Sequence, residues 1–128
     1  MRRVSVWILG SLISSSVWAE TPQAIQQHYA EQVPAFSAWS ASAGEKFYAA
    51  QGPKGLACSS CHTTDPRNAG KHEKTAKPIE PLAPSANAQR FSDLAKVEKW
   101  FTRNCQDVLG RACTAQEKGD LMAFVLSR

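Results

Sequence analysis

The chain has 128 residues, of which 43% are hydrophobic and 20% are charged, which is enough for one domain with a single apolar core. Fifteen basic residues against eleven acidic ones give a formal net charge of +4. Two of the basic residues, Arg2 and Arg3, lie in a segment that we expect to be removed, which leaves +2. With no nucleic-acid motif and no phosphate-binding glycine loop in the sequence, this balance does not indicate a nucleic-acid partner.

Residues 1–19 have the pattern of a secretory signal. The two arginines are followed by an apolar stretch from Val4 to Leu12 and by a small-residue cleavage site at Val17-Trp18-Ala19. The apolar stretch is short and is followed by serines, so a cleaved signal fits better than a membrane span, although an uncleaved anchor stays open. We therefore expect a signal peptide over 1–19, one domain over 20–128 and a periplasmic location.

The most specific motif is Cys58-Ser59-Ser60-Cys61-His62. Two thiols at this spacing can each add to one vinyl group of a haem, and the imidazole of the next residue then binds the iron. A Cys-x-x-Cys pair also occurs in zinc sites and in thioredoxin-like proteins. Zinc would require a second close pair, and a thioredoxin-like motif would follow an apolar strand, whereas a turn precedes this motif. The motif predicts one covalent haem c on Cys58 and Cys61, with His62 as proximal ligand.

The other two cysteines are Cys105 and Cys113. Once the first pair is bound to haem, they are the remaining thiols of an exported chain. An oxidising compartment favours a disulfide between them.

The sequence predicts helices separated by loops. Thr21 caps a first helix over 22–33, which a proline ends. A second helix starts near residue 40 or 42 and runs to 50, with Gly44 and an aromatic residue on one side. Glycine is unfavourable within a helix, which suggests that another backbone passes close to Gly44.

The segment from 63 to 87 contains several prolines and has no sustained period. We expect a long irregular loop, and a loop of this length suggests that it wraps the haem. Within it, His72 is a candidate distal ligand or, alternatively, a solvated histidine. A third helix is expected from Ser92, its cap, to about Arg103, and a last helix from the capping box at 114–117 to about 127.

This order of a helix, an attachment site, a long loop and two helices resembles class I cytochromes c. Gly44 and Tyr48, together with Asp-Leu-Met-Ala-Phe at 120–124, carry the resemblance. It implies an all-α fold of about four helices and a long loop wrapped around one covalently attached haem, with the first and last helices crossing. Members of this class usually place a methionine ligand in the loop before the last helix. Here Met122 lies inside that helix and is poorly placed to bind iron.

The segment 96–114 resembles more narrowly the sphaeroides haem protein family, in which an asparagine just ahead of a disulfide supplies the sixth ligand. The resemblance implies that Asn104 is the distal ligand of oxidised iron, next to a Cys105–Cys113 disulfide. Without it, Asn104 would be interpreted as a helix C-cap, because asparagine tolerates the left-handed conformation. The family is also characterised by transient oxygen binding in the reduced form. The resemblance further implies redox partners such as a dihaem cytochrome c and a membrane b-type cytochrome.

Two functional hypotheses follow. In the first, the protein transfers electrons, and the hard, weak amide ligand leaves on reduction, so that ferrous haem binds oxygen, nitric oxide or other diatomics. In the second, it is a simple electron carrier whose axial positions are filled by His62 and His72. Residues that would cleave a peroxide are not identifiable, so an oxygen- or nitric-oxide-linked enzymatic activity is left open. We expect a monomer.

Overall fold

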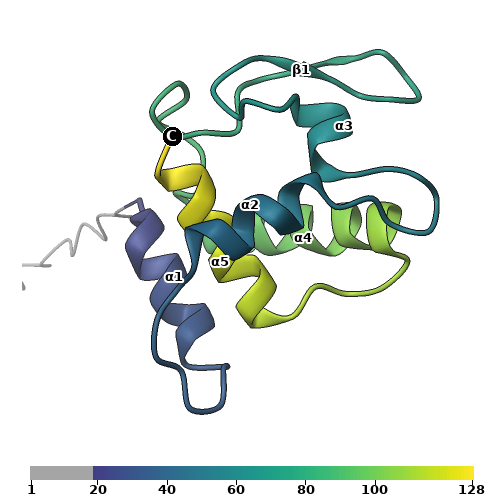
Figure 1. Cartoon of the computed structure of the whole chain (residues 1–128). Helices are drawn as coiled ribbons and strands as arrows, with labels where there is room; N and C mark the ends of the chain where they lie inside the picture. The colour runs from purple at the N-terminus through teal and green to yellow at the C-terminus, as the bar shows by residue number, and fades with distance from the viewer. Residues whose placement is uncertain (1–18) are drawn as a thin grey trace, which may run out of the picture.

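The computed structural model describes residues 19–128, and nearly all of the expected signal peptide lies outside the described residues. The described residues form five helices and one small antiparallel sheet, and Figure 1 shows their arrangement. The helices are α1 (Pro22–Ala30), α2 (Ala41–Ala49), α3 (Cys58–His62), α4 (Leu94–Leu109) and α5 (Ala115–Leu126), and the strands are β1 (Gly70–Lys71) and β2 (Pro78–Ile79). Within the described residues, every helix is too short or too polar to cross a bilayer.

Side-chain caps set the starts of the helices. The Thr21 hydroxyl accepts a hydrogen bond from the amide of Ala24 at 3.1 Å, and the Ser40 hydroxyl accepts one from Ala43 at 3.1 Å. These bonds satisfy amides that have no partner inside the helix. The predicted starts of α1 and α2 are confirmed. However, α1 ends at Ala30, three residues earlier than the proline at 34 suggested.

The crossing of α2 and α5 organises the fold. A Cβ atom added to Gly44 would lie 2.5 Å from the carbonyl carbon of Asp120, so the two backbones are in direct contact. The rings of Tyr48 and Phe124 lie 5.2 Å apart beside this contact. The amide of Ser40 donates to a carboxylate oxygen of Asp120 at 2.7 Å. The close approach expected at Gly44 is confirmed.

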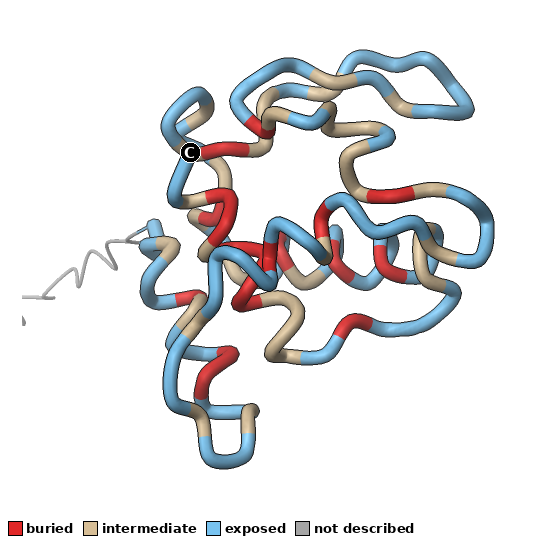
Figure 2. Tube along the Cα trace, viewed as in Figure 1, coloured by how far each residue is buried: buried red, intermediate tan, exposed pale blue. Residues whose placement is uncertain are grey.

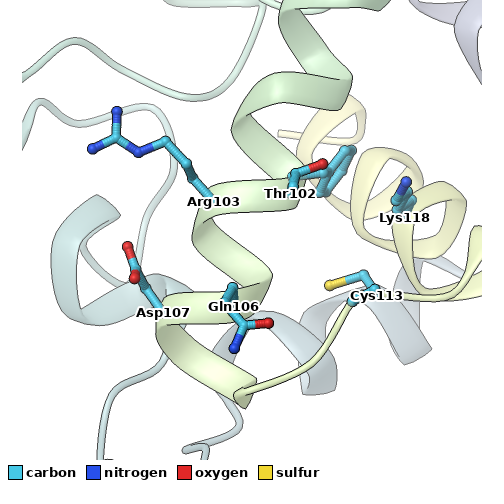
Figure 3. A pocket seen from close by; sticks show the side chains of 8 residues that line it. Thr102, Arg103, Gln106, Asp107, Cys113 and Lys118 are labelled. Atoms are coloured by element: carbon cyan, nitrogen blue, oxygen red, sulfur yellow. The ribbon is translucent and has the colours of Figure 1, made fainter.

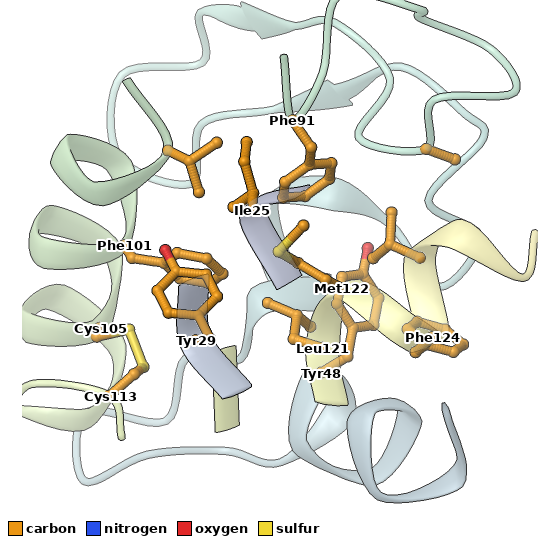
Figure 4. Close-up of a cluster of buried hydrophobic side chains, with 13 residues drawn as sticks. Ile25, Tyr29, Tyr48, Phe91, Phe101, Cys105, Cys113, Leu121, Met122 and Phe124 are labelled. Carbon is orange, nitrogen blue, oxygen red and sulfur yellow. A yellow bond between two sulfur atoms is a disulfide. The ribbon is translucent and has the colours of Figure 1, made fainter. Parts of the chain in front are cut away.

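The buried core combines side chains of α1, α2, α4 and α5 (Figure 4), and Figure 2 shows the buried positions along the chain in red. The Tyr29 ring of α1 packs edge-on against Phe101 of α4, with centroids 6.1 Å apart. Its hydroxyl donates to Glu98, which also accepts hydrogen bonds from the Lys118 ammonium at 2.9 and 3.0 Å. Because the polar groups are paired, the tyrosine can be buried without leaving an unsatisfied hydroxyl. Met122 is also in this core and is 0% exposed.

The structure corrects the prediction for α4. Asp93, not Ser92, caps the helix, and its carboxylate accepts from the amide of Lys96 at 2.9 Å. The helix continues to Leu109 and ends at Gly110, whose φ of +70° is left-handed. Glycine adopts that conformation without steric cost, so it ends the helix. Asn104 is therefore inside the helix, and its interpretation as a C-cap is wrong.

The long segment between α3 and α4 is more ordered than its sequence suggested. It contains the β1–β2 hairpin, with Gly70 opposite Ile79 and Lys71 opposite Pro78. A strand of two residues is too short to show an alternating pattern, so the sequence did not reveal β1 and β2. After the hairpin, the amides of Leu82 and Ala83 both donate to the Pro66 carbonyl, at 2.9 and 2.8 Å.

Candidate haem site

The attachment motif forms the short helix α3. Ala57 precedes it, and its amide donates to the Ser60 hydroxyl at 3.0 Å, which starts the turn. Cys58 and Cys61 are not joined in a disulfide and are partly buried. Residues three apart lie on the same side of a helix. The two thiols are therefore placed to form bonds with the same planar molecule.

His62 ends α3 and is partly buried. Burial lowers the pKa of its imidazole to about 4, and the nearby positive charge of Arg90 contributes to the decrease. At neutral pH the ring is then uncharged and retains a nitrogen lone pair. A neutral imidazole is the form that binds iron.

The β1–β2 hairpin and α2 hold α3 in place. A Cβ atom on Gly70 would lie 3.0 Å from the carbonyl carbon of Cys61, so the hairpin backbone rests directly on α3. The amide of Glu73 donates to the Cys61 sulfur at 3.4 Å. From the other side, the Tyr48 hydroxyl donates to the Thr63 carbonyl at 2.7 Å. The residue after His62 is thus fixed by the same tyrosine that packs in the helix crossing.

His72 lies in the turn of this hairpin. Its Nδ1 accepts hydrogen bonds from the amides of Lys74 and Thr75, at 3.3 and 3.2 Å. With Nδ1 accepting, the proton of the neutral ring is on Nε2. In this arrangement neither ring nitrogen offers a free lone pair to iron.

Asn104 lies on α4 and its side chain is exposed. The next residue, Cys105, is 6% exposed and forms a disulfide with Cys113, with Cα atoms 5.7 Å apart (Figure 4). The predicted disulfide is confirmed. It accounts for both remaining thiols, so they are not available as a second ligand pair for zinc.

Gly52 brings the loop before α3 into contact with α4. A Cβ atom on Gly52 would lie 2.7 Å from the carbonyl carbon of Val108, one turn after Asn104. The loop that leads into α3 therefore rests on the last turn of α4. The sequence predicted only a turn at residues 51–55, because a contact between distant segments leaves no local pattern.

Several apolar side chains around these elements are only partly covered. Phe47, Leu82, Leu94 and Leu109 pack on the core but stay partly exposed. Trp100, one turn before Asn104, is 43% exposed. Partly exposed apolar side chains are available to pack on a large planar cofactor. Together with two free thiols and a neutral imidazole, the residues present fit a covalent haem.

A separate cavity of about 430 Å³ lies beside the disulfide (Figure 3). The residues that line it are Phe101, Thr102, Arg103, Gln106, Asp107, Ala112, Cys113 and Lys118. None of the expected haem ligands is among them. Figure 3 shows Thr102 and Lys118 on one side of α4, and Arg103 and Asp107 on the other.

The fold and the attachment site define the class of this protein as a monohaem c-type cytochrome. Residues 34–125 match the model of a family described as a domain of unknown function, DUF1924, and the chain belongs to that family. Its class I cytochrome c fold is confirmed by the solved structures.

Two relatives are similar at the level of sequence. Cytochrome c'' of Methylophilus methylotrophus is 49% identical over 74 residues, which cover 58% of this chain and 51% of the relative. The cytochrome c-type protein SHP of Cereibacter sphaeroides is 49% identical over 76 residues, or 59% of this chain and 58% of the relative. The matched part thus spans little more than half the length of these relatives.

Solved structures of an SHP and of Methylophilus methylotrophus cytochrome c'' are also similar to this chain. Oxidised SHP, described as an oxygen-binding cytochrome c, has a TM-score of 0.78 and 37% identity, covering 86% of this chain and 99% of that one. A solution structure of cytochrome c'', described as giving insights into haem-ligand detachment, has a TM-score of 0.72 and 37% identity. It covers 84% of this chain and 93% of that one.

Proposed function

We propose that this protein is an electron-transfer cytochrome in which the Asn104 side chain binds oxidised iron and leaves when the iron is reduced. A covalent haem would supply a one-electron iron couple and, with its sixth position free, binding of oxygen, nitric oxide or similar molecules. The similarity to a protein described as oxygen-binding and to one described by ligand detachment supports this proposal.

The position of Asn104 is the observation that carries the proposal. Its backbone groups belong to the interior of α4, while its side-chain amide is exposed. The amide oxygen is a hard donor that suits ferric iron better than the softer ferrous iron. Reduction therefore weakens this bond, whereas the imidazole of His62 remains a good ligand in both states.

Two contacts hold the backbone near Asn104. The disulfide closes the chain between Cys105 and Cys113, which are eight positions apart. Gly52 rests against Val108, one turn further along α4. Because these two contacts hold the helix, the ligand moves mainly by rotation of the Asn104 side chain, and it stays close enough to rebind.

The cellular setting is part of the proposal. A disulfide in a small domain is typical of proteins exported to an oxidising compartment, and the basic and apolar start of the sequence is typical of an export signal. We therefore propose a periplasmic location, and we also propose that the protein is a monomer. Its proposed partners are redox proteins, including a dihaem cytochrome c and a membrane b-type cytochrome.

The variant Asn104→Ala tests the distal ligand. Gln106→Ala is the matched control, because Gln106 is an exposed residue two positions along the same helix. We expect the oxidised Asn104→Ala protein to lose the absorption bands of six-coordinate haem, and the oxidised control to keep the wild-type bands. If oxidised Asn104→Ala has the wild-type spectrum, Asn104 is not the ligand.

A third variant distinguishes the simple-carrier hypothesis. His72→Ala should leave the oxidised and reduced spectra unchanged, because both hydrogen bonds at Nδ1 come from its own turn. A changed spectrum in His72→Ala together with an unchanged one in Asn104→Ala would favour axial ligation by His62 and His72.

A further inference from the structure

Thr63, the residue after His62, has an unusual backbone conformation. Its φ of +65° and ψ of 173° lie in a region that almost only glycine occupies. Threonine is poorly suited to this region, because its branched side chain crowds the backbone when φ is positive. Such a conformation persists only where neighbouring groups hold it, and it occurs most often at functional sites. The backbone directly after the expected proximal ligand is therefore strained.

Two hydrogen bonds hold Thr63 in this conformation. The Tyr48 hydroxyl donates to the Thr63 carbonyl at 2.7 Å, and the Thr63 hydroxyl donates to the Asp65 carbonyl at 2.7 Å. The second bond is made within the turn, so it moves with the turn. Of the two, only the bond from Tyr48 joins Thr63 to another element, α2. This bond therefore decides where the Thr63 carbonyl lies relative to the helices.

Tyr48 is a rigid support for this bond. Its side chain is 2% exposed, and its ring packs against Phe124 of α5. One turn earlier on α2, Gly44 lies against the backbone of Asp120. Because this crossing holds α2 and α5 together, the Tyr48 hydroxyl has little freedom to move. The helix crossing thus fixes the position of the Thr63 carbonyl.

The position of Thr63 in turn limits the orientation of His62. The two residues share a planar peptide group, so the direction of the Thr63 backbone constrains that of His62. On the other side of His62, the backbone of Gly70 rests directly on the carbonyl of Cys61. Other segments of the chain therefore hold the residues on both sides of the proximal ligand.

We propose that Tyr48 is a positioning residue for the proximal ligand: its hydroxyl keeps Thr63 in the strained conformation and so fixes the plane of the His62 imidazole. Groups around a ligating histidine set the orientation of its ring. Tyr48 acts through the Thr63 backbone rather than on the imidazole itself. The inference requires a covalent haem bound by His62, and it does not depend on Asn104 as a ligand.

The test compares two variants of the haem-loaded, oxidised protein by proton NMR, because the shifts of the haem methyl groups follow the orientation of the axial imidazole. Tyr48→Phe removes the hydroxyl and keeps the ring that packs against Phe124. Tyr29→Phe is the matched control, since it also removes a buried tyrosine hydroxyl, but one that donates to Glu98. We expect Tyr48→Phe to change the spread of the methyl shifts, and Tyr29→Phe to keep the wild-type spread.

Thermal melting of the same variants separates positioning from stability. Tyr48→Phe should melt close to the wild type, because relaxation of Thr63 offsets the lost hydrogen bond, whereas Tyr29→Phe should melt earlier. A wild-type spread of methyl shifts in Tyr48→Phe would overturn the proposal, and so would the same change in both variants.

A second variant covers the case in which Tyr48→Phe does not retain haem. Tyr48→Phe combined with Thr63→Gly should retain it, because glycine adopts this conformation without support. If the double variant also fails to retain haem, the proposal is overturned. None of these outcomes depends on the spectral change expected for Asn104→Ala, which concerns the other side of the iron.

Discussion

Replacing Gly44 with alanine tests the helix crossing on which the fold depends. The added Cβ would lie 2.5 Å from the carbonyl carbon of Asp120 and 3.0 Å from the amide nitrogen of Leu121. Real Cβ contacts closer than 3.0 Å essentially do not occur, and ordinary contact begins at 3.4 Å. Because both neighbours are backbone atoms, no side chain can rotate away. The carbonyl oxygen of Asp120 lies closer still, so the two helices would have to separate by at least about 1 Å.

The cost follows from two opposing effects. Forced separation in a well-packed core costs about 3 kcal/mol, at the upper end of the usual range. Alanine recovers about 1 kcal/mol because it is a better helix former than glycine. We therefore expect Gly44→Ala to lower the free energy of unfolding by about 2 kcal/mol. For a domain of about this size, that corresponds to a melting temperature lower by about 8 °C.

Circular dichroism at the helix band, recorded during heating of the oxidised protein, measures this effect. Ser42→Ala is the control, because Ser42 is exposed on the same helix and the change is also to alanine. The control should melt at or slightly above the wild-type temperature. If Gly44→Ala melts at or above the wild-type temperature as well, the backbone contact between α2 and α5 is wrong.

Three further predictions concern the supports of α4. Replacing Cys105 and Cys113 together with serine should lower the free energy of unfolding by about 2.5 kcal/mol, because the unfolded chain gains freedom; an unchanged urea midpoint would contradict this. Tyr29→Phe removes the hydroxyl that donates to Glu98 and should lower the free energy of unfolding, measured with urea, by about 1.5 kcal/mol. The same substitution at a tyrosine outside this hydrogen-bond network should not show this loss. Burial alone would raise the pKa of Glu98, but hydrogen bonds from Tyr29 and Lys118 lower it on balance. The charged Glu98 side chain therefore stabilises the fold above about pH 4.5, and this stabilisation is lost as the pH falls through the lower folded-state pKa. Urea midpoints of the wild type and of Glu98→Gln, compared at neutral and acid pH, would measure this loss.

Local signals in the sequence were sufficient for the starts of most helices. Thr21, Ser40 and Thr114 cap α1, α2 and α5 as predicted, and the box formed by Thr114 and Glu117 is present. A cap depends on residues within one turn, so a short stretch of sequence contains the information. The close contact at Gly44 was also predictable, since glycine inside a helix needs a reason.

The end of α4 was harder to predict. Asn104 and Gly110 both tolerate the left-handed conformation that ends a helix. What decides between them is that Cys105 continues the buried side of the helix and is tied to Cys113. That depends on tertiary packing, which the local sequence does not contain.

The candidate site shows the same division. Cys58, Cys61 and His62 form a motif that is legible from spacing alone. Gly52 was missed, because its role depends on a contact with Val108 elsewhere in the chain. Chain segments that meet only in the folded protein leave no periodic signal.

The visible absorption spectrum of the purified protein, first oxidised and then reduced without oxygen, tests the central claim most directly. We expect sharp six-coordinate bands in the oxidised protein that depend on Asn104. In the reduced protein we expect a broad high-spin band that changes when nitric oxide is added. Sharp low-spin bands in the reduced protein that do not respond to nitric oxide would contradict the account, because a strong distal ligand would then be retained in both redox states.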